Sequence, residues 1–170
     1  MSREFSLWYD YEILPVSLFM RNLIRTFDTQ IIHRLRELEA PLARIAIFIV
    51  YSWFGFLKLL GVSSATPLVQ ALFERTITFM PFATFYALFA LFEMAIGILF
   101  LVRGMERLAI FLLGIHLFTT ALPLIFLPQL TWLTFLVPTF EGQYIIKNIL
   151  IAASAVVVGS KLVPFASRAH

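Results

Sequence analysis

The sequence contains no cysteine, and charged residues make up only 14% of its 170 positions. The lack of cysteine excludes disulfide bonds, thiol redox chemistry and thiolate metal ligands. The net charge is only +3, and no basic and aromatic patch of the kind that binds nucleic acid is present. Walker, GxGxxG, HExxH and GxSxG motifs are also absent, so the sequence indicates no catalytic residues of these classes. The three histidines, His33, His116 and His170, are too far apart in sequence to indicate a metal site.

Hydrophobic residues, in contrast, make up 61% of the sequence, and 19 residues are Phe. A folded chain of this length has too much surface relative to its volume to bury so many apolar side chains. A lipid bilayer is the natural solvent for the excess. We therefore expect an all-α integral membrane protein.

Four stretches are long and apolar enough to cross a bilayer, which takes about 20 residues at a rise of 1.5 Å each. They cover residues 42–60, 82–102, 108–127 and 144–163. We expect Gly61–Pro81 to form a long loop between the first two, and Gln129–Gln143, which is too short to span, to lie in the outer interface. The sequence thus predicts a four-helix transmembrane bundle.

Lysine and arginine lie mainly on one side of the predicted spans, and this bias sets the orientation of membrane proteins. That side carries Arg3, Arg21, Arg25, Arg34, Arg36, Arg44, Arg103, Arg107, Lys161 and Arg168, whereas the loops of the other side carry only Arg75. We therefore expect a cytoplasmic N-terminus and a cytoplasmic C-terminal tail, residues 164–170.

Residues 1–41 precede the bundle and contain a segment with helical periodicity between Pro15 and Pro41. Its apolar residues recur every four positions, at Leu23, Phe27, Ile31 and Leu35. The pattern predicts an amphipathic helix on the inner leaflet, with basic residues toward anionic head groups. The alternative is a cytoplasmic helix that packs on the bundle or on a partner.

Two polar residues, Glu93 and His116, lie within the second and third predicted spans, where they are costly. They are 12 residues before and 11 residues after Met105, the turn of the predicted hairpin. Both should therefore lie at similar depth, roughly 17 Å from the turn, and we expect them to meet inside the bundle. Trp53 should lie near the same level. This group is either a ligand-binding or proton-linked site, or a structural hydrogen bond.

A second polar group is expected at the outer face, where Lys58 ends the first span and Lys147 begins the fourth. The residues close to them in the sequence or in the loops are Glu141, Tyr144, Asn148 and Glu74. One interpretation is an electropositive pocket for a quinone head group or a small anion. The other is that both lysines extend to the interface and pair with Glu74 and Glu141.

Three stretches resemble the DoxX-like family of four-helix membrane proteins. They are Trp53–Ser63 (WFGFLKLLGVS), Glu93–Gly97 (EMAIG) and Pro138–Asn148 (PTFEGQYIIKN). The resemblance runs from about Arg44 to Val158 and is strongest for the YkgB/RclC-type branch, which is linked to resistance against reactive chlorine. It implies a four-helix bundle in the bacterial inner membrane. Another branch of the family forms a subunit of a thiosulfate:quinone oxidoreductase, and others associate with redox enzymes or act as membrane chaperones.

These features leave three functions open. The first is a non-enzymatic role in oxidative or envelope stress, through a membrane partner or a homo-oligomer. The second is a quinone-interacting subunit of a membrane oxidoreductase, with quinone as the cofactor. The third, a small-solute or proton-coupled carrier, has the least support, because no span is clearly broken and four spans give no inverted repeat of the usual kind.

Overall fold

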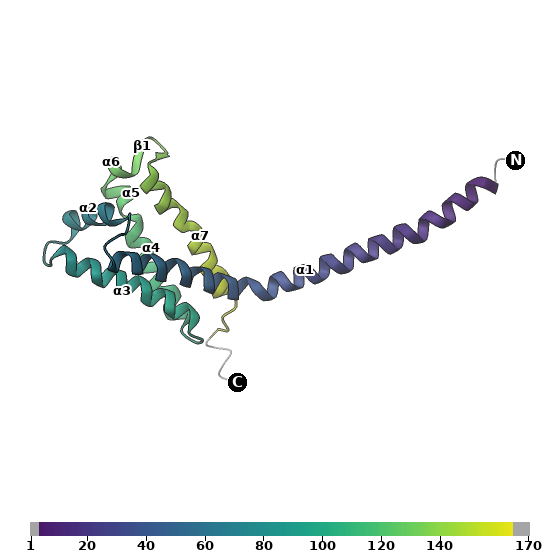
Figure 1. Ribbon diagram of the computed structural model, residues 1–170, viewed down its shortest axis with the longest axis horizontal. Helices are drawn as coiled ribbons and strands as arrows, with labels where there is room; N and C mark the ends of the chain where they lie inside the picture. Colours follow the sequence, from purple (N-terminus) through teal and green to yellow (C-terminus); the bar gives the residue numbers. More distant parts are fainter. Residues whose placement is uncertain (1–3, 165–170) are drawn as a thin grey trace. The chain divides into compact units, whose positions relative to one another are not determined.

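The computed structural model describes the backbone of residues 4–164 and the side chains of residues 18–164. The chain divides into two compact units, residues 1–39 and residues 40–170. Figure 1 shows the elements in chain order. They are α1 (Glu4–Leu59), α2 (Thr66–Thr76), α3 (Phe82–Leu101), α4 (Glu106–Ala121), α5 (Pro123–Phe126), α6 (Pro128–Thr131), β1 (Trp132–Thr134), β2 (Val137–Pro138) and α7 (Phe140–Ser160).

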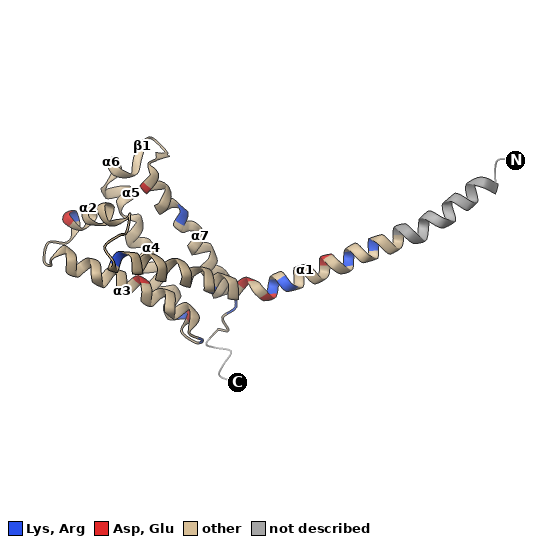
Figure 2. Ribbon diagram, in the orientation of Figure 1, with Lys and Arg blue, Asp and Glu red and all other residues tan. Residues whose placement is uncertain are grey.

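Four helical stretches are long and apolar enough to cross a membrane, as the hydropathy of the sequence predicts. They are Leu18–Leu59, Phe82–Leu101, Glu106–Phe126 and Phe140–Ser160. The last begins four residues before the predicted start at Tyr144, because the hydroxyl of Thr139 accepts a hydrogen bond from the backbone N–H of Gly142 and caps the helix. Figure 2 shows how few charged residues α3, α4 and α7 carry.

Helix α1 continues through Pro41, the residue at which the predicted N-terminal segment ends. Proline removes one backbone donor from a helix interior, a loss that membrane-spanning helices tolerate when neighbouring groups satisfy the freed carbonyl. The same helix includes Pro15, whose side chain lies outside the described residues. In the unit of residues 1–39, Phe27, Ile31 and Leu35 are all more than half exposed. Contact of this helix with a membrane surface stays a prediction.

The segment Gly61–Pro81 is not simply a loop, because it contains helix α2. Pro67 lies in the first turn of this helix, where its missing N–H group costs nothing. Phe73, the buried residue of α2, packs on Phe82 and Phe85 with ring centroids 5.4 and 4.9 Å apart. Helix α2 therefore covers the beginning of α3.

A small β-hairpin forms within Gln129–Gln143 and is a minor addition to a bundle that is otherwise all-α, as the sequence predicts. Strands β1 and β2 are antiparallel, with Trp132 opposite Pro138. Leu136 in the turn has a positive φ of 61°, a left-handed conformation that leucine rarely adopts. The neighbouring Phe135 is 89% exposed. The hairpin thus presents an apolar tip, and its contact with the outer interface stays a prediction.

The hairpin is held against the start of α7 by a close backbone contact. A Cβ atom on Gly142 would lie 2.2 Å from the carbonyl oxygen of Thr131, so only glycine fits at this position. Thr131 is fully buried, and its carbonyl accepts a hydrogen bond from the backbone N–H of Thr139. These contacts fix the position at which α7 begins.

The core of the larger unit lies among α1, α3, α4 and α7. Its buried side chains include Ile47, Tyr51, Ile96, Phe100, Ala109, Leu113, Ala155 and Val158. At one end of this core, the guanidinium of Arg44 donates to the carbonyl oxygens of Phe100 and Leu101 and to the carboxylate of Glu106. Arg44 therefore joins α1 to the end of α3 and the start of α4.

Candidate functional site

The candidate site depends on a close approach between α1 and α3. A Cβ atom on Gly55 would lie 2.9 Å from the carbonyl oxygen of Ala90. A Cβ atom on Gly97 would lie 3.2 Å from the carbonyl oxygen of Phe48. Small residues allow helix backbones to approach in this way. Lys58, one turn after Gly55, is thereby brought against α3.

Lys58 forms a buried ion pair with Glu93. Its Nζ atom lies 2.6 Å from Oε2 of Glu93, and the two side chains are only 6% and 7% exposed. The sequence instead expects Lys58 to extend outward and to pair with Glu74 or Glu141, and its partner in the structure is Glu93. Because the lysine stem is long and flexible, its ammonium can reach a carboxylate on a neighbouring helix as readily as the interface.

Glu93 also meets His116, as the hairpin spacing predicts. Oε1 of Glu93 lies 3.0 Å from Nε2 of His116. The other ring nitrogen, Nδ1, lies 2.9 Å from the hydroxyl of Tyr51. The tautomer of His116 that satisfies both contacts has Nε2–H donating to the Glu93 carboxylate and Nδ1 accepting from the tyrosine hydroxyl; this tautomer is assigned from the hydrogen-bond network. Four polar side chains from three helices thus form one hydrogen-bonded chain from Lys58 to Tyr51.

Tyr51 takes the place that the sequence assigns to Trp53. Trp53 is 63% exposed, whereas Tyr51 is buried. Tyr51 and Trp53 lie at nearly the same depth in the bundle, so depth alone does not decide which of them reaches His116. Their side chains point in different directions around the axis of α1. Tyr51 and Lys58 are seven residues apart, which is close to two helical turns, so they share one face of α1. This spacing is the signal in the sequence that could have identified Tyr51.

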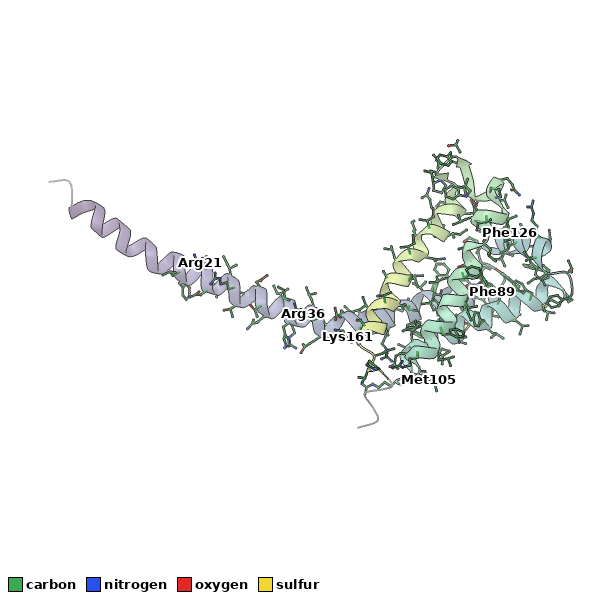
Figure 3. All side chains as sticks on the ribbon, turned by 180° about the vertical axis from the view of Figure 1, so that it is seen from behind. Arg21, Arg36, Phe89, Met105, Phe126 and Lys161 are labelled. Atoms are coloured by element: carbon green, nitrogen blue, oxygen red, sulfur yellow. The ribbon has the colours of Figure 1, made fainter. Side chains whose placement is uncertain are left out.

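Aromatic side chains surround the chain of polar groups. The ring of Phe89 stacks on His116 with centroids 5.2 Å apart, and Nζ of Lys58 lies 5.6 Å from the centroid of the same ring. Figure 3 labels Phe89, between the ends of the bundle marked by Met105 and Phe126. An ammonium over an aromatic face is stabilised by the negative potential of the ring. Phe89 therefore supports both Lys58 and His116.

A cavity of about 560 Å³ lies beside these groups. Tyr51, Lys58, Glu93 and His116 all line it. Its other walls are mainly apolar and come from α1, α2, α3, α4 and α7, with Phe54, Leu68, Leu72, Phe85 and Ile151 among them. A mostly apolar cavity of this size with a few convergent polar groups is typical of small-molecule sites.

The outer-face group that the sequence predicts is divided in the structure. Glu141, Tyr144 and Asn148 line the cavity. Lys147 is exposed, with its Nζ 5.1 Å from the ring centroid of Tyr144. Glu74 is exposed and accepts a hydrogen bond from Gln70. Among the described residues, no ion pair joins Lys147 to Glu74 or Glu141, which the sequence offers as partners.

The donor set of the site fits an organic ligand better than a metal ion. Within the described part of the chain, no three His, Asp or Glu side chains are placed to hold a metal. The ammonium of Lys58 has three N–H donors, one of which binds Glu93. The remaining donors suit acceptor oxygens of a ligand.

Comparison of this chain with protein-family models, with curated proteins and with solved structures finds no match.

Proposed function

We propose that this protein is a multi-pass membrane protein that binds a lipid-soluble molecule with a polar head group, of the quinone class. The observation that carries the proposal is the position of the hydrogen-bonded chain from Lys58 to Tyr51 along the wall of the cavity of about 560 Å³. This proposal favours the quinone-interacting function among those that the sequence leaves open.

Energetics argue for a role beyond helix packing. Buried ion pairs recover their desolvation cost poorly, and apolar residues of similar volume often stabilise a protein as well or better. Lys58 and Glu93 are nevertheless both buried, and both line the cavity. Polar groups of this kind inside a membrane protein indicate a functional site by default.

The residues that line the cavity fit a quinone head group. Lys58 can donate to a carbonyl oxygen, while Glu93 and His116 keep a proton within reach of it. The aromatic rings of Phe85 and Phe89 and the apolar walls suit a flat ring and the beginning of a lipid tail. A bound quinone supplies redox chemistry, whereas the residues of this chain hold the head group and exclude water.

The proposal is tested by quinone binding to the full-length protein in lipid nanodiscs, measured by quenching of tryptophan fluorescence. We expect Lys58→Met to weaken binding of a short-chain benzoquinone by tenfold or more, on the order of the 1.5–3 kcal/mol of a hydrogen bond to a charged group. Lys147→Met removes an equal charge from an exposed position and should bind as the wild type does. Equal effects of the two substitutions, or no binding by the wild type, would overturn the proposal.

A second candidate function is the stress-related role through a membrane partner, which the resemblance to DoxX-like proteins implies. It is favoured by the helix of residues 18–38, where apolar side chains such as Phe27, Ile31 and Leu35 are exposed. We expect deletion of residues 1–39 to release a co-purified membrane protein while leaving quinone binding intact. If every association survives the deletion, this function loses its main support.

We further propose that both termini are cytoplasmic and that the membrane is the bacterial inner membrane. Arg44 and Arg107 support this orientation, because they bind the end of α3 and the carbonyl oxygen of Val163, and so gather at the end where the chain leaves α7. The cysteine-free chain allows a direct test with single-cysteine variants. A water-soluble thiol reagent added outside intact cells should label Val62→Cys and leave Arg103→Cys unlabelled.

A further inference from the structure

A second set of polar groups lines the same cavity, separate from the chain between Lys58 and Tyr51. Thr119 and Thr120 on α4 and Asn148 on α7 all border it. The hydroxyls of both threonines donate to the carbonyl oxygen of His116, at 2.9 Å each. Both threonine hydroxyl donors are therefore occupied. Asn148 is the residue of this set that can still form hydrogen bonds.

The side-chain amide of Asn148 forms only one long hydrogen bond. Its Nδ2 lies 3.5 Å from Oγ1 of Thr120, at the outer limit of a hydrogen bond. A side-chain amide has two N–H donors and an acceptor oxygen, so this one long contact uses little of its capacity. Asn148 is half-buried beside the apolar Ile145 and Ile151 of the cavity wall, where unmet hydrogen-bonding capacity is costly. A ligand atom in the cavity would meet that capacity.

The position of Asn148 relative to the buried ion pair follows from α4. Thr120 is four residues after His116, so the two side chains share one face of the helix, about 5–6 Å apart at their Cβ atoms. Asn148 contacts Thr120, whereas Glu93 contacts His116. Asn148 and the polar chain therefore contact α4 at positions one helical turn apart, and both border the cavity.

We infer that the cavity holds a ring with hydrogen-bonding atoms at both ends, one at Lys58, Glu93 and His116 and the other at Asn148. This inference rests on the proposed function and adds a residue that determines ligand specificity. Asn148 donates to the far oxygen of the ring, while Lys58 donates to the near one. Molecules with a single polar end occupy the cavity without using Asn148.

The test compares two ligands in binding to the full-length protein in nanodiscs. One is a short-chain benzoquinone, and the other is the matching cyclic enone in which a dimethyl-substituted carbon replaces one carbonyl, so that it cannot tautomerise to a phenol. We expect Asn148→Leu to weaken binding of the quinone about tenfold, which corresponds to the loss of about one net hydrogen bond, and to leave binding of the enone unchanged. Lys58→Met should weaken binding of both ligands.

Gln143→Leu is the matched control, because it removes an amide from an exposed position of the same helix. The melting temperature of Asn148→Leu should stay within a few degrees of the wild type, which excludes misfolding. Thr120→Val is a second variant and should keep the preference for the quinone, since it leaves the amide of Asn148 in place. If Asn148→Leu weakens both ligands equally, or neither, the inference is wrong. In that case a continued loss with Lys58→Met still supports the proposed function, whereas a wild type that binds neither ligand overturns both.

Discussion

The Nζ atom of Lys58 and the Oε2 atom of Glu93 are 2.6 Å apart, and both side chains are almost fully removed from solvent. This pair joins the end of α1 to the middle of α3. It also forms one end of the hydrogen-bonded chain that continues through His116 to Tyr51.

Removing one partner of the pair should destabilise the protein more than removing both. Lys58→Met leaves the carboxylate of Glu93 buried without its ammonium, and we expect a loss of about 3 kcal/mol. The double variant Lys58→Met, Glu93→Leu should recover a large part of that loss, because no charge stays unpaired. Thermal unfolding in detergent measures both effects. Additive losses in the double variant would show that the pair is not coupled.

Tyr51→Phe should lower stability by about 1–2 kcal/mol, because it leaves Nδ1 of His116 without its hydrogen-bond partner. Trp53→Phe, two residues away on an exposed face, is the matched control and should change stability by less than about 0.5 kcal/mol. Thermal unfolding of both variants measures the two losses of stability. A larger loss for Trp53→Phe would contradict the assignment of Tyr51 to the site.

Gly55→Ala should move α1 away from α3 and weaken both stability and ligand binding. Its Cβ atom would lie 2.6 Å from Cγ of Met94 and 2.9 Å from the carbonyl oxygen of Ala90. Methionine can move, but the backbone carbonyl cannot move as easily, and overpacking of this kind costs about 1–3 kcal/mol. Gly114→Ala serves as the control, since nothing lies within 4 Å of its added Cβ atom. Similar melting temperatures for the two variants would argue against the close approach.

Arg44→Lys should destabilise the end of the bundle where α3 and α4 meet. The guanidinium reaches two carbonyl oxygens and Glu106, and a lysine ammonium does not reproduce this planar, forked geometry. We expect a loss of about 1–2 kcal/mol, reduced by the partial exposure of the side chain. Arg103→Lys, at an exposed position of the nearby turn, should have little effect. Hydrogen exchange of the last turn of α3 reports the change locally.

The contact between Glu93 and His116 could be predicted because it depends only on helix geometry. Two helices of a hairpin have the same rise per residue, so equal distances from the turn place residues at equal depth. The partner of Lys58 could not be predicted in this way. Its side chain can extend toward the interface or toward the bundle, and the choice depends on which carboxylate the neighbouring helix presents.

The four apolar helices and the shared level of Glu93 and His116 follow from hydropathy and helical rise, which are local properties of the chain. In contrast, the inward turn of Lys58, the contact of Tyr51 instead of Trp53 with His116, and the place of Asn148 beside the cavity depend on how the helices pack. The β-hairpin before α7 is likewise a feature of the tertiary structure. These features depend on the rotation of each helix about its axis and on close backbone contacts such as that of Gly55 with Ala90. Packing between distant segments sets both, and no local pattern records them.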